Sequence, residues 1–436
     1  MENLYEKCIV NDCIPEEAYN KNNVFRGLRD INGNGVVTGL TNISMIKSFD
    51  YINGTKIPCD GKLWYRGYPI ENLVSGNSNE LQFEKIAYLL VTGEMPNQSE
   101  LSQFKETLAD FRKLPRNFIR DVIMKAPTAD IMNSLTKSIL TLSSYDKARK
   151  DLSNENSLVQ CIRLIAEFPE LAVYAYRAYA HYVKRKSMII HIPDRNLSTA
   201  ENILLMLRDD KHYTHMEAKV LDTALILHAE HGGGNNSTFT IRVVTSTGSD
   251  TYSAIAAALC SLKGPKHGGA NIKAVDMMED AAHSIKDHKD REEIRNYIYN
   301  ILSRNAFDNS GLIYGMGHAV YSLSDPREII LKKQAEVLAK EKKKEKLFDF
   351  YRIFEEEAIK AICEKRKIYK GVCPNVDFYS GLVYSLLGIP KEMFTPIFAI
   401  ARIAGWSAHR MEELIGANKV IRPAYKSIMQ IKENII

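Results

Sequence analysis

Four short segments combine glycine, histidine and charged residues in a chain whose surrounding pattern is otherwise plain helix. They are HAEHGGGNNST at 228–238, LKGPKHGGAN at 262–271, IYGMGHAVYSLSDPRE at 313–328 and PNVDFYSGLVY at 374–384. A neutral histidine can donate a hydrogen bond to an oxygen that gains negative charge, and an arginine can hold a carboxylate. An aspartate can accept a proton. These residue types favour chemistry in which an enolate-like oxygen and a carboxylate are stabilised.

The first segment places two histidines near the end of an apolar helix. His228 and His231 are three positions apart, so they lie on one helical face. The glycines that follow allow the backbone to approach a ligand closely. An anion-binding histidine followed by exposed amides fits this pattern, and so does a histidine with satisfied hydrogen bonds at a helix C-terminus. A metal site needs a third ligand, which the sequence does not supply locally.

The second segment places His267 between a Gly-Pro break and a new amphipathic helix, so we expect it at the N-terminus of that helix. The positive end of the helix dipole disfavours imidazolium, which would leave a neutral donor for an enolate-like oxygen. A histidine that only caps a helix or serves a turn fits this position equally well.

The third and fourth segments bring charged residues to helix starts. Arg327 follows Pro326 at a predicted helix start, where its charge opposes the dipole. A bound carboxylate gripped by the guanidinium group would explain that placement. Two glycines precede His318 in the same segment. Asp377 lies just ahead of a predicted helix, where it could equally be an ordinary N-cap.

Helical periodicity dominates from about residue 80 onward. Apolar residues recur at helical spacing in three stripes, over residues 101–111, 272–285 and 294–301. Residues 250–262 are small and apolar nearly all round, which predicts a helix buried between others. The run 332–348 interleaves lysine and glutamate at helical spacing and predicts a solvated helix face.

The first 75 residues differ from the rest because they are rich in glycine and asparagine. Residues 54–70, GTKIPCDGKLWYRGYPI, predict a small β-hairpin before the helices begin. Gly33, Gly35 and Gly39 look like a phosphate-binding loop, but no apolar strand precedes them and no clean helix follows. We therefore expect a turn-rich N-terminal segment.

The length of 436 residues exceeds what one hydrophobic core usually organises, so we expect two domains, or one large domain with a smaller insertion. Hydrophobic residues make up 45% and charged residues 25%, which is ordinary for a soluble globular protein. The net charge of +5 is mild and spread along the chain, so it is a weak reason to suspect nucleic acid. No apolar run approaches the length of a membrane span.

The seven cysteines are scattered and form no C-x-x-C pair, which argues against a disulfide framework or a zinc knuckle. This pattern indicates a reducing compartment. The N-terminal residues MENLYEKCIV resemble neither a signal peptide nor a transit peptide. We therefore expect a cytoplasmic protein that acts without a metal, a nucleic acid or a membrane.

In this order and at these separations, the four segments together resemble the citrate synthase family. The similarity is clearest from about residue 200 to 425, while RGYPIENL at 66–73 matches more loosely. The resemblance implies an all-α citrate synthase fold with a short N-terminal β-hairpin. It implies a large helical domain, residues 1–267 and 384–436, with a small helical domain, residues 268–383, inserted in it. It also implies a two-fold homodimer.

The resemblance assigns roles to individual positions. The implied catalytic residues are His267, His318 and Asp377. The implied oxaloacetate-binding residues are His231, Asn235, Arg327, Arg402 and Arg422. The implied coenzyme A contacts are Gly315, Met316, Gly317 and Lys370. Arg422 would reach into the partner subunit's site.

The implied enzyme is an acyltransferase that condenses acetyl-CoA with oxaloacetate and hydrolyses citryl-CoA to citrate and CoA. Asp377 would remove a methyl proton from the thioester, His267 would hydrogen-bond the forming enolate oxygen, and His318 would polarise the ketone. Acetyl-CoA would be a co-substrate, and no tightly bound cofactor is expected.

Three alternatives stay open at this point. A 2-methylcitrate synthase would use the same residues on propionyl-CoA, and one methylene discriminates by only about 1–3 kcal/mol. A metalloprotein could use His228, His231, His267 and His318 as ligands. A catalytically silent relative is the third alternative. The sequence HGGGNN replaces the family's commoner acidic-Gly run after His231, and no module for regulation by NADH is recognisable.

Overall fold

The computed structural model of the chain describes residues 2–24, 26–29, 35–74, 80–318, 320–366, 371–416 and 419–429. The chain divides into two compact units, Met1–Leu40 and Thr41–Ile436. Within the described part of the chain, no helix is long and apolar enough to cross a membrane.

The first unit contains short helices rather than turns alone. They are α1 (Glu2–Asp12), α2 (Glu16–Lys21) and the 3₁₀ turn η1 (Arg26–Leu28). None of these helices buries a residue. The prediction of a turn-rich segment was therefore wrong for α1 and α2, which lack the apolar stripe that signals a packed helix. Gly33 lies outside the described residues, and no helix follows Gly35 or Gly39 directly.

The second unit begins with a three-stranded antiparallel sheet of β1 (Ser44–Ile52), β2 (Thr55–Tyr65) and β3 (Tyr68–Pro69). Asn53 and Gly54 form the turn between β1 and β2, and both have positive φ, 51° and 77°. An Asn-Gly pair suits this turn because both positions require φ above zero. The predicted hairpin is confirmed. Its strand β2 pairs mainly with β1, which precedes residues 54–70, the segment from which the hairpin was predicted.

The rest of the second unit is helical. The helices before the glycine-rich segments are α3 (Ile70–Val74), α4 (Phe83–Thr92), α5 (Gln98–Phe111), the π-helical turn η2 (Ile119–Ile123), α6 (Ile131–Leu142), α7 (Asn154–Tyr182), α8 (Thr199–Leu207) and α9 (His215–His228). Those that follow are α10 (Asn236–Thr245), α11 (Thr251–Leu262), α12 (Ala270–Ser284), α13 (Arg291–Leu302), α14 (Pro326–Glu341), α15 (Glu345–Arg366), α16 (Val376–Leu386), the 3₁₀ turn η3 (Lys391–Met393) and α17 (Phe394–Gly416). The expectation of a mainly helical fold is confirmed.

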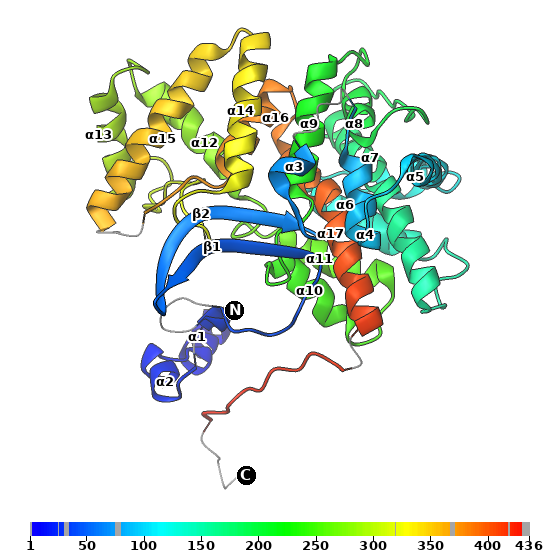
Figure 1. Cartoon of the computed structure of the whole chain (residues 1–436), viewed down its shortest axis with the longest axis horizontal. Helices are drawn as coiled ribbons and strands as arrows, with labels where there is room; N and C mark the ends of the chain where they lie inside the picture. Colours follow the sequence, from blue (N-terminus) through cyan, green and yellow to red (C-terminus); the bar gives the residue numbers. More distant parts are fainter. Residues whose placement is uncertain are drawn as a thin grey trace. The chain divides into compact units, whose positions relative to one another are not determined.

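Helix α17 runs through the middle of one helical group, with α4, α6, α7, α9, α10 and α11 packed around it (Figure 1). Nearly every residue of α17 is buried, including Trp406 and Arg402. A helix that is apolar all round must lie inside the protein, and its few polar groups must find partners there. Side chains from α17 can therefore reach several of the glycine-rich segments.

Helices α12 to α16 form a second group, in which α13 packs on α15 and α16 packs on both α12 and α14 (Figure 1). Helices α14 and α15 run side by side as a hairpin. The second group meets the first where α12 contacts α17 and where α14 contacts α9. The segments containing His267, His318 and Asp377 connect these helices.

The helical predictions hold with one difference. The three apolar stripes become α5, α12 and α13, and residues 250–262 become α11 behind the N-cap Asp250. The lysine- and glutamate-rich run 332–348 is not one helix face, because the chain reverses at Lys342–Lys344 between α14 and α15. Lys343 has a φ of 56°, which ends α14. Charge spacing alone carries no signal for this reversal.

Candidate active site

Backbone pairing joins the segment before His318 to the segment before Asp377. The N–H of Gly317 donates to the carbonyl oxygen of Cys373 at 2.8 Å, and the N–H of Asn375 donates to that of Gly315 at 2.8 Å. Met316 and Pro374 form an isolated antiparallel bridge. Two segments nearly sixty residues apart in sequence thus form a short ladder, and His318 and Asp377 each follow one of its strands.

Gly315 is required in this ladder for two reasons. Its φ of 79° lies in the region that side chains disfavour, and a Cβ atom there would lie 2.9 Å from the Cα atom of Phe378. Phe378 follows Asp377 in the first turn of α16. The glycine therefore lets the His318 segment pack directly against the helix that carries Asp377.

His318 follows this ladder and lies next to the rings of His231 and Tyr321. Its ring centre lies 5.1 Å from that of His231 and 4.8 Å from that of Tyr321. The Tyr321 hydroxyl is 3.3 Å from His231 Nε2. The backbone N–H groups of Val320 and Tyr321 donate to His318 Nδ1, at 3.0 and 3.2 Å. In neutral His318 the proton is therefore on Nε2, which makes Nε2 a donor.

The β2 strand supports this ring cluster from outside. A Cβ atom at Gly61 would lie 2.1 Å from the Ser324 carbonyl oxygen and 2.6 Å from the Tyr321 ring, so only glycine fits there. The N–H of Gly61 donates to Ser324 Oγ at 3.0 Å. The hairpin therefore holds the segment between His318 and α14 in place.

Arg327 lies in the first turn of α14 and is almost fully buried. Asp325 caps the helix, accepts from the Arg327 N–H at 3.0 Å and forms an ion pair with its guanidinium group at 2.7 Å. Arg327 Nη2 also lies 3.4 Å from His318 Nε2. The protein itself, through Asp325, supplies a carboxylate that balances Arg327 at this helix start. The guanidinium group still faces His318.

Asp377 is not the N-cap of α16. Asn375 caps this helix by accepting from the Asp377 N–H at 2.9 Å. Asp377 therefore lies in the first turn, and its carboxyl group does not cap the helix. Burial raises the pKa of Asp377 to about 6, with Arg327 and Arg402 opposing the rise and Asp325 adding to it. A carboxyl group with this pKa is ionised at pH 7 and is a stronger base than an ordinary aspartate.

His267 lies in the turn before α12, three residues ahead of the first helical residue. Its Nε2 atom is 3.2 Å from Ser237 Oγ, and Trp406 Nε1 donates to the same oxygen at 3.2 Å. Burial, aided by Arg402, lowers the pKa of His267 to about 4. The prediction of a neutral His267 fits this shift, for which burial and Arg402 are the causes.

Arg402 approaches the same region from α17. Its Nε donates to the carbonyl oxygen of His228 at 2.6 Å, and its Nη1 is buried without a hydrogen-bond partner among the described residues. The His228 ring stacks on Phe398, one turn earlier on α17, with 4.0 Å between ring centres. A buried guanidinium nitrogen without a partner is costly, so this position suits an anionic ligand or ordered water.

The first predicted segment contains two buried and uncharged histidines. Burial lowers the pKa of both His228 and His231, and the nearby Arg327 and Arg402 lower it further. Neither ring nitrogen of His228 has a partner among the described residues, so the interpretation of His228 as a satisfied C-terminal histidine was wrong. Beside these neutral histidines, the unpartnered Nη1 of Arg402 is the group that suits an anionic ligand.

The structure therefore brings six of the predicted residues together. We call them the central cluster: His231, His267, His318, Arg327, Asp377 and Arg402. Asn235 borders it, because its Oδ1 accepts from Ser237 Oγ at 2.9 Å. Gly315, Met316 and Gly317 form the ladder next to His318. Lys370 lies outside the described residues.

Arg422 does not join the central cluster within its own chain. Its side chain is exposed and forms no hydrogen bond or ion pair with any described residue. The neighbouring Ile421 N–H donates to Ser246 Oγ at 3.0 Å, beyond the end of α10. Residues 420–429 have no helix or strand.

The metalloprotein alternative gains no support from this geometry. Among the residues that the structure describes, no group of three or more His, Cys, Asp or Glu side chains could hold a metal ion. His231 and His318 are adjacent, but the neighbours of this pair are a tyrosine and arginines.

Sequence reasoning missed the residues that hold the central cluster in position. These are Ser237 beside His267, Tyr321 beside His231, Asp325 beside Arg327 and Asn375 beside Asp377. Two of them carry a sequence signal, because Asp before Pro and Asn two residues before a helical Asp are typical N-caps. Glu230 was also missed. It is buried and accepts from His409 Nε2 at 2.9 Å and from Ser44 Oγ at 2.9 Å.

The chain is similar to known proteins over nearly its whole length. Residues 32–424 match the family model described as citrate synthase, C-terminal domain. The citrate synthase of Synechocystis sp. is 38% identical over 388 residues, covering 88% of this chain and 89% of the relative. A 2-methylcitrate synthase of Corynebacterium glutamicum is 34% identical over 379 residues, covering 86% of this chain and 91% of the relative.

Solved structures agree with these relatives. The citrate synthase of Thermoplasma acidophilum, in a ternary complex with carboxymethyl coenzyme A and oxaloacetate, matches with a TM-score of 0.78 at 27% identity, covering 94% of this chain and 97% of that one. The ladder that pairs the His318 and Asp377 segments, the central cluster and these similarities lead to one conclusion. The chain belongs to the citrate synthase family.

Proposed function

We propose that this enzyme condenses acetyl-CoA with oxaloacetate and hydrolyses the resulting citryl-CoA to citrate and CoA. The observation that supports the proposal is the central cluster, in which a carboxyl group of raised pKa, histidines and two buried arginines lie near one another. The Thermoplasma relative was solved with oxaloacetate and a coenzyme A derivative, which supports the same substrate pair here. No tightly bound cofactor is needed for this reaction.

In the proposed mechanism, the arginines bind oxaloacetate first. Arg402 Nη1, buried without a partner, would hold one carboxylate, and Arg327 and His231 would hold the rest of the molecule. Guanidinium groups suit this task because their paired donors match carboxylate geometry. Bound oxaloacetate would then present its ketone oxygen to the Nε2 donor of His318.

Asp377 would take a proton from the methyl group of acetyl-CoA. The negative charge moves to the thioester oxygen, where neutral His267 would donate a hydrogen bond. Ser237 Oγ lies 3.2 Å from His267 Nε2 and would hold the imidazole ring in place beside the thioester. The enolate carbon attacks the ketone carbon, a C–C bond forms, and the ketone oxygen becomes the hydroxyl of citryl-CoA. Water then cleaves the thioester to citrate and CoA.

Other features of the proposal rest on the family resemblance. We place the coenzyme A contacts at Gly315, Met316, Gly317 and Lys370, and the small domain that closes over the substrates at residues 268–383. The proposed assembly is a homodimer in which Arg422 serves the partner subunit's site. This assignment requires an exposed Arg422, and Arg422 is exposed and has no partner among the described residues of its own chain. The seven free thiols fit a cytoplasmic enzyme.

A steady-state comparison of two thioesters tests the proposal. With saturating oxaloacetate, kcat/KM for acetyl-CoA should exceed that for propionyl-CoA, with release of CoA followed by a thiol reagent and citrate identified directly. The reverse order would assign the enzyme to 2-methylcitrate synthesis, which the similarity to the Corynebacterium relative keeps as the second candidate. Absence of CoA release with both thioesters would contradict both assignments.

A further inference from the structure

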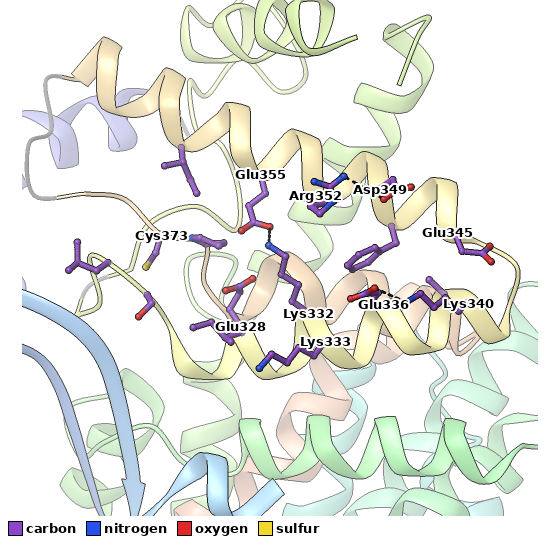
Figure 2. A pocket seen from close by; sticks show the side chains of 17 residues that line it. Glu328, Lys332, Lys333, Glu336, Lys340, Glu345, Asp349, Arg352, Glu355 and Cys373 are labelled. Atoms are coloured by element: carbon purple, nitrogen blue, oxygen red, sulfur yellow. Dashed lines mark hydrogen bonds and ion pairs between the residues drawn. The ribbon is translucent and has the colours of Figure 1, made fainter. Parts of the chain in front are cut away.

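A groove lies between α14 and α15, outside the central cluster (Figure 2). It has a volume of about 630 Å³, within the usual range of small-molecule sites. Its apolar lining includes Ile329, Phe348 and Ile359. Cys373 lies at one end of the groove and Glu345 at the other (Figure 2). The lysine- and glutamate-rich run 332–348 therefore lines a pocket of ligand size and is not simply a solvent-exposed helix face.

Most charges in the groove already have partners. Three cations are paired with carboxylates: Lys332 with Glu355 at 2.6 Å, Lys340 with Glu336 at 2.7 Å and Arg352 with Asp349 at 3.7 Å. Two lining carboxyl groups, those of Glu328 and Glu345, have no ion pair with any described residue. Lys333 also has no ion pair with any described residue, so five acidic and four basic residues line the groove and their charges nearly balance.

Glu328 is the unusual member of this lining. Its side chain is 4% exposed, and its Oε1 atom is buried with no hydrogen-bond partner among the described residues. Figure 2 shows its carboxyl group projecting from α14 toward α15, beside the Lys332–Glu355 pair. A buried polar atom without a partner costs about 1–3 kcal/mol, so a ligand that supplies a donor here would recover that loss.

An ammonium group is the donor that complements a buried carboxyl group best, because the hydrogen bond is then charge-assisted. The apolar lining next to Glu328 suits a hydrocarbon body. We propose that the α14–α15 groove binds a small organic amine, with its ammonium group on Glu328 and its apolar part against Phe348 and its neighbours.

The end of the groove at Cys373 is built from residues that adjoin the catalytic segments in sequence or pair with them. Glu328 directly follows Arg327, and Pro374 pairs with Met316, two residues before His318. The Cys373 carbonyl accepts from Gly317, and Asp377 follows Pro374 by three residues. An amine in the groove thus contacts the segments that position the central cluster without entering that cluster.

Amine binding at this site is linked to proton release. Burial raises the pKa of Glu328 to about 8, Glu355 and Asp325 add to the rise, and Lys332 opposes it. Cys373 and Tyr379 also face this carboxyl group. At pH 7 free Glu328 is therefore mostly protonated, and pairing with an ammonium ion favours its ionised form. Each amine bound at pH 7 should release close to one proton to the buffer.

Isothermal titration calorimetry of the full chain tests the proposal, with 2-phenylethylamine as the probe and 2-phenylethanol as its neutral counterpart. At pH 7, in two buffers of different ionisation enthalpy, the amine should bind saturably with proton release. The alcohol should bind at least about tenfold more weakly, since a charge-assisted hydrogen bond contributes about 1.5–3 kcal/mol. Equal affinity of the two probes, or no binding of the amine, would overturn the proposal.

Two variants locate the site. Glu328→Gln should weaken the amine at least about tenfold and abolish proton release. Glu292→Gln, which changes an exposed carboxylate on α13 outside the groove, should bind like the unchanged protein. Unaltered binding by Glu328→Gln would place the amine elsewhere. These binding measurements need no turnover, so their outcome does not depend on the proposed condensation. The comparison of amine and alcohol uses the unchanged protein, so it does not depend on whether the variants fold.

Discussion

Asn375 donates from Nδ2 to the carbonyl oxygen of Gly317 at 2.8 Å, while its Oδ1 accepts from the Asp377 N–H at 2.9 Å. One amide side chain thus caps α16 and ties the segment before His318 to the helix of Asp377. We predict that Asn375→Ser, which keeps the cap but loses the link, retains most of the stability but lowers kcat by about tenfold or more. Small displacements of catalytic groups are costly to rate.

A matched pair of alanine variants separates capping from positioning. Asn97 caps α5 by accepting from the Glu100 N–H, far from the central cluster in the chain. Asn97→Ala and Asn375→Ala should each lose about 1 kcal/mol of unfolding free energy. Only Asn375→Ala should also lose activity. Equal activity of the two variants in steady-state assays would show that Asn375 is a cap and nothing more.

The pH dependence of kcat/KM should show one acidic limb. The proposed base, Asp377, has a pKa of about 6, and only its ionised form can accept the methyl proton. Activity should therefore fall about tenfold per pH unit below pH 6. His267, with a pKa of about 4, stays neutral between pH 5 and 8 and should add no limb of its own. A profile that is flat from pH 5 to 8 would remove Asp377 from the role.

Ser237 should matter to the enolisation step more than to oxaloacetate binding. Its hydroxyl oxygen lies 3.2 Å from His267 Nε2 and positions the imidazole ring. Ser237→Ala should lower kcat by about 10- to 100-fold. Exchange of the thioester methyl protons with solvent should slow by the same factor, and the KM for oxaloacetate should stay within about twofold. Normal exchange in this variant would leave Ser237 as a packing residue beside Trp406.

Five of the six central-cluster residues lie in or beside breaks of helical periodicity near glycine or proline, whereas Arg402 lies inside α17 and was indicated only by the family resemblance. Such breaks are local and visible in the chain. The helices α5, α11, α12 and α13 were predictable for the same reason, since their apolar stripes are local patterns too.

What the sequence could not supply are pairings between distant segments. The ladder from Gly315 to Asn375 and the contact of Gly61 with Tyr321 join residues that carry no mutual signal in a single sequence. The cause of the lowered His267 pKa was also out of reach, because burial and the approach of Arg402 from α17 are tertiary effects.

Stability should fall as the pH rises through 8, in part because of Glu167 on α7. Burial raises the pKa of Glu167 to about 8, Arg163 opposes the rise and Asp146 adds to it. A group whose pKa is higher in the folded state stabilises it fully below its unfolded pKa of about 4.5, and that contribution is lost as the pH rises through 8.

Glu167→Gln removes the titration, so its unfolding free energy relative to the unchanged protein should rise between pH 5 and pH 8, by up to about 1.4 kcal/mol per pH unit. Urea unfolding at a series of pH values measures this difference. Glu155→Gln, at an exposed position of the same helix, is the control and should change nothing. A Glu167→Gln difference that does not vary with pH would contradict the assignment.

The last prediction concerns the proposed dimer and the exposed Arg422. If Arg422 serves the partner subunit's site, Arg422→Ala and Asp377→Asn homodimers should each be nearly inactive. A dimer of one subunit of each kind would then have one site with both residues intact and a second site lacking both. After random exchange in an equal mixture, about half the dimers are mixed, and each has one good site of two.

About one quarter of the unchanged activity should therefore return when the two inactive variants are unfolded and refolded together. An Arg422 that acts within its own chain predicts no recovery, because every site in the mixture then lacks either Asp377 or Arg422. Differential tags on the two variants establish that subunits have exchanged, so a mixture that exchanges fully but stays inactive would refute the shared site. Since Arg422 has no partner among the described residues of its own chain, that outcome would also leave its charge without a structural role.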